Sequence, residues 1–327
     1  MYLDKYIYEN NVSTDYPVFK DNIFVDLKMP VNDLFLAQYK DLSFNAVDIV
    51  FKYLAIENYY NINDYGFNLY NKLQYYRTGK DWSNRFKDLI KSFEYGYNLN
   101  SKVETDLNYS IHDGAHRVAL CLFHNIDDIN VRIFNTFLYR REYGFSYIEK
   151  YFNKNEINII KVKLNELLNK CNHPYYCILW TPAYFIFNDL KKDLINTYDV
   201  NLLSDSIISF NEEKLRKFIY DVYKTDDIKK EKLDLKYKYI INSIHKSGIS
   251  SPYQVNLIKL DLNNPLFRLK PLTGLPQSKK TMMIKSYLRD KYQKSIVDYH
   301  YDIMMHMTDN TTQNRDVNKV LKKVGNL

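Results

Sequence analysis

The stretch "SIHDGAHRVAL", residues 110–120, decides how the first part of the chain folds. Asp113 and Gly114 are followed by two basic side chains, His116 and Arg117, and an apolar run then begins at Val118. The residues before Asp113 read as a short extended piece, and "HRVALCLFHNI" has the spacing of a helix. The pattern therefore predicts a strand, a tight polar turn and the first turn of a helix.

A polar turn of this kind can hold an anion, because the backbone N–H groups and the dipole at a helix N-terminus favour negative charge. Arg117 offers a planar fork of donors that matches phosphate oxygens, and His116 can donate beside it. Gly114 allows close approach of the backbone and a positive φ. Asp113 can fix a basic neighbour or accept from a ligand hydroxyl. The alternative is that Asp113 caps the helix and that His116 and Arg117 are ordinary first-turn residues.

The sequence Asp113-Gly114-Ala115-His116-Arg117, with its apolar continuation, resembles the phosphate-binding signature of the ParB/sulfiredoxin superfamily. The resemblance spans residues 20–135, including the strand "INVRIF" after the helix. Sulfiredoxins carry a nucleophilic cysteine where this chain has Ala115. ParB proteins carry an arginine-rich version and continue into a helix-turn-helix region, which we do not find after residue 150. The motif is most similar in form to the small-metabolite (free-serine) kinase branch.

This resemblance implies a nucleotide-binding domain that uses ATP or another nucleotide with Mg²⁺. We assign cofactor binding to Gly114, Ala115, His116 and Arg117, and catalytic roles to Asp113 and His116. In the kinase branch an acidic general base lies outside the motif. Asp33 and Glu57 are candidates for it, although each reads better as a surface carboxylate.

The rest of the chain alternates between extended and helical patterns. Helical spacing is clear at residues 45–60, 83–98 and 157–171, and a strand pattern ends near Pro30. Beyond residue 170, short apolar strands alternate with amphipathic helices, which predicts an α/β layer with parallel pairing. We therefore expect an α/β protein with two domains. Residues 1–150 form a mixed α+β, ParB/sulfiredoxin-like nucleotide-binding domain, and residues 151–327 form an α/β domain that binds the acceptor.

A second polar cluster lies near the C-terminus, in "DIMMHMTDNTTQN" at residues 302–314. His306 and Asp309 end a predicted strand before a helix, the place where open α/β sheets bind ligands. Upstream, Lys285 and Arg289 share one helix face at i and i+4 spacing. We predict that these four residues bind the substrate and that His306 and Asp309 line a cleft. The alternative is a helix cap at Asp309 and a solvated basic face.

Composition narrows the classes of function. The 327 residues carry a formal net charge of +7, which suits an anionic small molecule better than a long nucleic-acid footprint. The cysteine count is 3, with no CxxC pair, so neither a disulfide framework nor a zinc site is expected, and we assign no metal-ligating residues. No signal peptide and no run of 18 apolar residues is present, so we expect a cytoplasmic protein without a membrane partner.

The function that these features favour is a nucleotide-dependent, kinase-like phosphotransferase acting on a small hydroxylated metabolite or sugar. The alternative is a non-catalytic ParB-like protein that senses nucleotides or associates with DNA. The mild charge and the missing helix-turn-helix favour the enzyme. The residues leave open which nucleotide and acceptor are used, and whether the protein forms oligomers.

Overall fold

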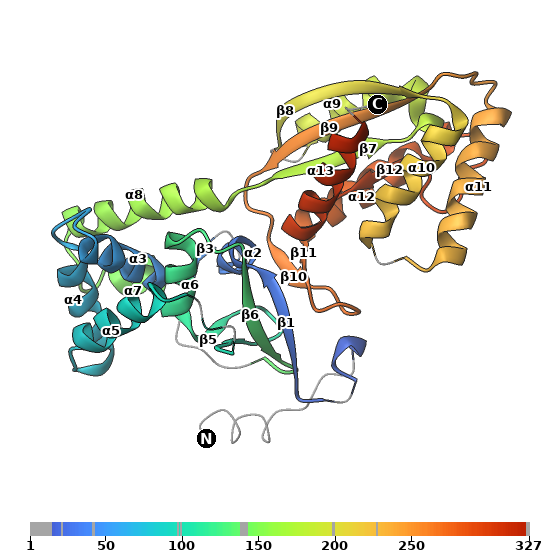
Figure 1. Ribbon diagram of the computed structural model, residues 1–327. Helices are drawn as coiled ribbons and strands as arrows, with labels where there is room; N and C mark the ends of the chain where they lie inside the picture. Colours follow the sequence, from blue (N-terminus) through green and yellow to red (C-terminus); the bar gives the residue numbers. More distant parts are fainter. Residues whose placement is uncertain are drawn as a thin grey trace. The chain divides into compact units, whose positions relative to one another are not determined.

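The computed structural model describes residues 15–20, 22–40, 43–96, 98, 100–137, 143–197, 200–226 and 228–324. The chain divides into two compact units, drawn in Figure 1. The first comprises Met1–Cys171 and Leu266–Gln277, and the second comprises Asn172–Pro265 and Ser278–Leu327. Both contain helices and a four-stranded sheet, which confirms the expected α/β class.

The sheet of the first unit has the order β1-β6-β4-β5. Strand β1 pairs antiparallel with β6, β6 pairs parallel with β4, and β4 pairs antiparallel with β5. The elements of this unit are β1 (Phe24–Pro30), α2 (Val31–Leu36), β2 (Tyr39–Lys40), β3 (Ser43–Phe44), α3 (Asp48–Tyr59), α4 (Gly66–Thr78), α5 (Ser83–Phe93), β4 (Val103–Thr105), β5 (Ile111–Asp113), α6 (Ala115–Phe123), β6 (Asp128–Phe134), α7 (Phe145–Ile148) and α8 (Lys154–Cys171).

Helix α3 is the centre of the first unit. Its sequence "DIVFKYLAIE" is apolar on every side, as expected of a helix that other elements surround. It contacts α4, α6 and α8, and all of its residues from Asp48 to Glu57 are buried. Two charged side chains, Asp48 and Lys52, are therefore enclosed with the apolar ones.

The boundary between the units lies at Cys171/Asn172, later than the predicted residue 150. Helix α8 belongs to the first unit because it buries Ile160, Leu164 and Leu167 in that unit's core. A two-stranded ribbon of β10 (Phe267–Leu269) and β11 (Pro276–Ser278) also contributes to the first core, through Phe267 and Leu269. The chain thus returns to the first unit after it has begun the second.

The second unit has a sheet of order β12-β7-β9-β8, and all three pairings are antiparallel. The prediction of parallel pairing is wrong here. Strands β7 and β8 do run in the same direction across the crossover helix α9, but β9 inserts between them in the opposite direction. The elements are β7 (Pro174–Leu179), α9 (Phe187–Thr197), β8 (Val200–Phe210), α10 (Glu212–Tyr223), α11 (Lys230–Lys246), β9 (Tyr253–Leu262), α12 (Lys279–Tyr292), β12 (Met305–Met307) and α13 (Thr311–Val324).

All three cysteines are buried and unpaired. Burial raises the pKa of each of these thiols, Cys121, Cys171 and Cys177, to about 12, so they pack as small apolar side chains. Within the described part of the chain, no helix combines the length and the apolar character needed to cross a membrane.

Candidate phosphate-binding site

The turn at Asp113–Arg117 has the predicted strand–turn–helix geometry. Strand β5 ends at Asp113, Gly114 has φ of 95°, and α6 begins at Ala115. A Cβ built on Gly114 would lie 2.9 Å from Cγ2 and 3.0 Å from Cα of Val103. Gly114 itself is the N-cap and no side chain caps the helix, so the alternative in which Asp113 caps α6 is wrong.

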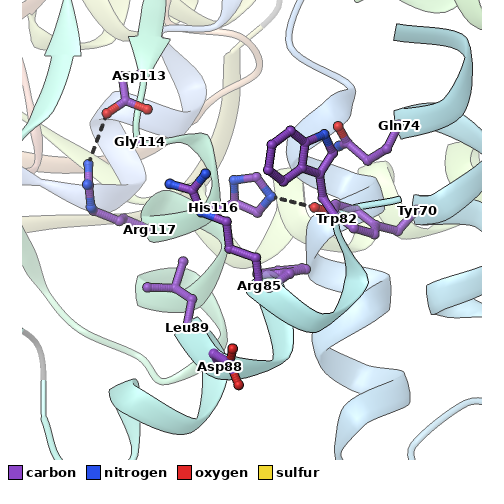
Figure 2. A pocket seen from close by; sticks show the side chains of 11 residues that line it. Tyr70, Gln74, Trp82, Arg85, Asp88, Leu89, Asp113, Gly114, His116 and Arg117 are labelled. Carbon is purple, nitrogen blue, oxygen red and sulfur yellow. Dashed lines mark hydrogen bonds and ion pairs between the residues drawn. The ribbon is translucent and has the colours of Figure 1, made fainter. Parts of the chain in front are cut away.

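A cavity of about 570 Å³ lies in front of this turn (Figure 2). Helices α4 and α5 and the turn before α6 form its walls. The lining residues are Tyr70, Gln74, Trp82, Arg85, Phe86, Asp88, Leu89, Asp113, Gly114, His116 and Arg117. Its size falls within the range of small-molecule sites in proteins.

Two guanidinium groups, carried by two different helices, line the cavity. Arg117 projects from the first turn of α6, where one Nη1–H donates to the carbonyl oxygen of Lys102 at 2.8 Å. The same nitrogen lies 3.5 Å from a carboxylate oxygen of Asp113, whose side chain is 68% exposed. Arg85 extends from α5 toward the same space (Figure 2). The cavity thus combines a helix N-terminus with two planar cations, a combination suited to phosphate oxygens.

The imidazole of His116 is held between two aromatic rings. Its Nε2 lies 3.0 Å from the hydroxyl of Tyr70, and its ring meets that of Phe86 edge-on at 4.6 Å. Desolvation, with a smaller contribution from the charge of Lys52, lowers the pKa of His116 well below its usual value. Desolvation also raises the pKa of Tyr70, so its hydroxyl keeps its proton and shares a hydrogen bond with Nε2. His116 is therefore neutral near pH 7.

Several residues of this cavity could not be found from the motif. Tyr70 and Gln74 come from α4, for which the sequence analysis gave no expectation, and Arg85 comes from the exposed side of α5. The signal for α4 is present but faint: Leu69, Tyr70 and Leu73 have helical spacing within a polar segment. Ala115, predicted to bind cofactor, begins α6 but is not among the residues that line this cavity.

The candidate general bases Asp33 and Glu57 are both buried, which corrects their reading as surface carboxylates. Glu57 accepts from the ammonium of Lys163 at 2.9 Å and from the amide of Asn63 at 3.2 Å. Neither carboxylate is among the residues that line the cavity at the turn. A role as general base therefore has no geometric support at either position.

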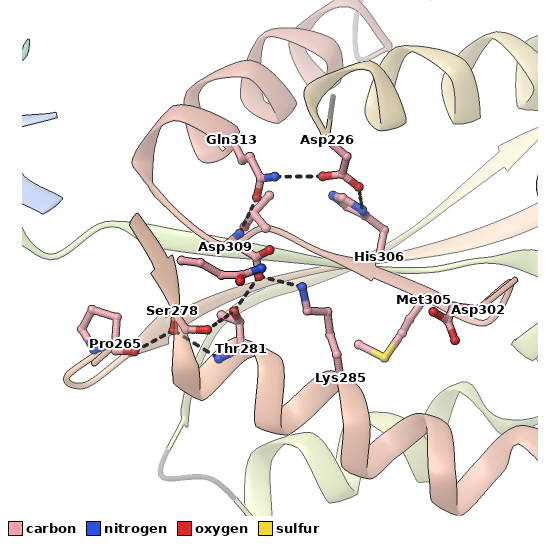
Figure 3. Close-up of polar contacts among 12 residues, drawn as sticks. Asp226, Pro265, Ser278, Thr281, Lys285, Asp302, Met305, His306, Asp309 and Gln313 are labelled. Carbon is pink, nitrogen blue, oxygen red and sulfur yellow. Dashed lines mark hydrogen bonds and ion pairs between the residues drawn. The ribbon is translucent and has the colours of Figure 1, made fainter. Parts of the chain in front are cut away.

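In the second unit, two of the four predicted substrate-binding residues, His306 and Asp309, are buried, and Figure 3 shows the polar contacts around them and Lys285. Asp309 accepts from the ammonium of Lys285 at 2.6 Å and from the hydroxyl of Thr281 at 2.7 Å. Its backbone N–H donates to Gln313, whose amide donates to Asp226. Lys285 and Asp309 are thus brought together, by the packing of α12 beside the end of β12.

His306 belongs to this network through Asp226, whereas Arg289 forms a separate ion pair. His306 is 4% exposed, and its Nδ1 lies 3.3 Å from a carboxylate oxygen of Asp226. Arg289 pairs with Asp302 at 3.1 Å. Both His306 and Asp309 are buried and contact protein groups, but Nε2 of His306 has no hydrogen-bond partner among the described residues, so the expectation that they line a cleft stays a prediction. Substrate binding by these four residues stays a prediction.

Comparisons with protein-family models, with curated proteins and with solved structures found no match. The resemblance to the ParB/sulfiredoxin superfamily therefore rests on the residues of the Asp113–Arg117 turn alone.

Proposed function

We propose that the protein is a nucleotide-dependent phosphotransferase whose nucleotide lies in the cavity at the Asp113–Arg117 turn. The observation that carries this proposal is the convergence of the α6 N-terminus with Arg85 and Arg117 on one cavity of about 570 Å³. The reaction transfers the terminal phosphoryl group of ATP or another nucleotide to a hydroxyl of a small metabolite or sugar. Its products are a nucleoside diphosphate, a phosphate ester and a proton.

The residues of the turn have separable roles in this proposal. Gly114 lets the phosphates approach the first N–H groups of α6, and Arg117 and Arg85 neutralise their charge. Because His116 is neutral, its Nδ1 can hydrogen-bond a ligand without adding charge. Trp82, over whose ring the Arg85 guanidinium lies at 5.5 Å, offers a face on which a base can stack.

The proposal includes Mg²⁺, and the carboxylates of the cavity fit it. Among the described residues there is no cluster of three or more His, Cys, Asp or Glu that could hold a metal ion. Mg²⁺ needs no such cluster, because it is usually bound through one or two carboxylates together with nucleotide phosphates. Asp113 and Asp88, which both line the cavity, would hold it. When bound, the ion would neutralise charge on the transferred phosphoryl group.

The proposal is tested by thermal shift against ATP, ADP, CTP and GTP with Mg²⁺, followed by an assay for nucleoside diphosphate formation with pools of hydroxylated metabolites and sugars. A preferred nucleotide should raise the unfolding temperature, since a ligand that binds only the folded state stabilises it. An acceptor should then increase diphosphate release. Binding without any acceptor-dependent release would favour the nucleotide-sensing alternative, and absence of nucleotide binding would contradict both.

A further inference from the structure

A second cavity, of about 350 Å³, lies beside the first and shares part of its wall. Gln74, Asp113, Gly114 and His116 line both cavities. The remaining lining of the second cavity comes from other elements: Asp48 and Lys52 of α3, Arg77 of α4, and Ile111, His112, Ala115 and Tyr143. The N-terminus of α6 therefore borders two cavities.

The second cavity contains a buried group of charges. Lys52 donates to Asp48 Oδ2 at 2.7 Å, and both side chains are 2% exposed. Arg77 Nη1 lies 3.4 Å from the same oxygen, and its guanidinium covers the ring of Tyr143 at 4.0 Å. Burying such charges is costly, and a buried ion pair does not generally stabilise a fold. Here the cations of Lys52 and Arg77 share one carboxylate oxygen of Asp48, so both are held at the wall of this cavity.

Two of the residues that line the second cavity carry buried hydrogen-bond donors. Within the part of the chain that the structure describes, Gln74 Nε2 and Arg77 Nε are buried and make no hydrogen bond. Gln74 is 5% exposed, and it lines both cavities. A buried donor without an acceptor costs free energy, so such groups call for an explanation. An anionic ligand in the cavity would supply the missing acceptor.

We propose that this second cavity binds the anionic group, a carboxylate or a phosphate, of the small acceptor. Lys52 and Arg77 supply the positive charge, and Gln74 donates from the wall that the two cavities share. This inference rests on the proposed function, because an acceptor held here presents its hydroxyl to a nucleotide phosphate at the N-terminus of α6. It assigns the acceptor to the first unit, whereas the sequence analysis expected it in residues 151–327.

The test measures binding of two probes, inorganic phosphate and malonate, by calorimetry with a non-hydrolysable ATP analogue present at saturation and also without it. The key variant is Arg77→Gln, which leaves the Lys52–Asp48 pair intact. The matched control is Arg85→Gln, which removes the same charge from the nucleotide cavity. We expect Arg77→Gln to weaken binding of at least one probe by about tenfold or more, because a charge-assisted hydrogen bond is lost. Arg85→Gln should change it by less than about twofold when the analogue occupies the first cavity.

A second variant, Gln74→Met, covers the case in which Arg77→Gln does not fold. It removes a donor that makes no hydrogen bond to any described residue, so the fold should tolerate it while probe binding weakens. The probe whose binding depends on Arg77 identifies the anion as a phosphate or a carboxylate. Equal probe affinity in wild type and in both wall variants, or no binding of either probe, would overturn the inference.

The two proposals fail in different ways. If the ATP analogue does not bind, the proposed function fails, yet probe binding without the analogue still reports whether Arg77 and Gln74 hold an anion. If the analogue binds normally and the probes do not, only the acceptor site is excluded.

Discussion

At the scale of single residues, Gly114 is constrained both by its backbone angle and by its neighbours. Its φ of 95° is unfavourable for any residue with a side chain, and a Cβ would be 2.9 Å from Val103 Cγ2. We predict that Gly114→Ala lowers the free energy of unfolding by more than about 1 kcal/mol and weakens nucleotide binding. Urea denaturation and calorimetry measure the two effects.

Gly79→Ala is the matched control for this substitution. Gly79 also has a positive φ, 68°, but a Cβ there would have no atom within 4 Å. It should show only the backbone strain and leave nucleotide affinity unchanged. If Gly114→Ala is no more destabilising than Gly79→Ala, close packing of the turn against β4 does not matter.

We predict that the buried imidazole of His116 makes the stability of the protein depend on pH. Its pKa in the folded protein is below that of the unfolded chain, so the unfolded state binds more protons as the pH falls. The contribution of His116 to the free energy of unfolding is therefore complete above the unfolded pKa of about 6.5, and it declines as the pH falls toward the folded pKa. The decline is at most about 1.4 kcal/mol per pH unit for one proton. Urea denaturation of wild type and His116→Gln between pH 7.5 and pH 5 isolates this residue, because other titrating groups largely cancel. Parallel pH profiles in the two proteins would show that His116 is not a buried neutral group.

What could be predicted about the site depended on where its residues lie in the sequence. Asp113 to Arg117 are contiguous, so their turn and helix start followed from local chemistry. Lys52, Gln74 and Arg85 come from three helices that only tertiary packing brings to the turn. Lys52 did leave a signal, as a single cation within the apolar run of α3. The burial of His306 and Asp309 was not predictable, because the end of a strand can be covered as well as open.

At the scale of elements, the position of α4 depends on its first residue. A Cβ on Gly66 would lie 1.9 Å from the carbonyl oxygen of Leu54, so only glycine allows α4 to approach α3 this closely. We predict that Gly66→Ala costs about 1–3 kcal/mol of stability through overpacking. It should also weaken nucleotide binding, because α4 carries Tyr70 and Gln74 into the cavity.

Denaturation and calorimetry of Gly66→Ala test this, with Gly144→Ala as the control. At Gly144 the nearest atom to a built Cβ is 3.6 Å away, an ordinary contact. If both substitutions are tolerated equally, the contact between α3 and α4 does not fix the position of α4.

Most helices and strands were predictable because their apolar spacing is local. Asn211 is an example: asparagine is a favoured N-cap residue, it directly precedes the helical pattern of α10, and its side chain accepts from the backbone of Lys214. Strand direction in the second unit was not predictable in this way. The insertion of β9 between β7 and β8 is decided by which strands pair, and two helices, α10 and α11, separate β8 from β9 in the chain.

At the scale of the whole molecule, the first unit is completed by residues 266–277. Phe267 and Leu269 pack in its core, and the buried Tyr109 hydroxyl donates to the carbonyl of Gly274 at 2.6 Å. We predict that residues 1–171 alone are less stable than the same segment with 266–277 joined by a flexible linker, by roughly 3 kcal/mol or more from two buried side chains. Urea denaturation of both chains measures the difference. Equal midpoints would mean that the first unit does not need the returning ribbon.

The central claim is that the Asp113–Arg117 turn binds nucleotide phosphates, and calorimetry of Arg117→Ala with ATP and Mg²⁺ tests it most directly. Losing this guanidinium should weaken binding by about 2 kcal/mol, or roughly thirtyfold. Lys91→Ala, on α5 but outside the cavity lining, removes the same charge and should leave affinity within about twofold. Unchanged ATP affinity in a folded Arg117→Ala protein would contradict the account.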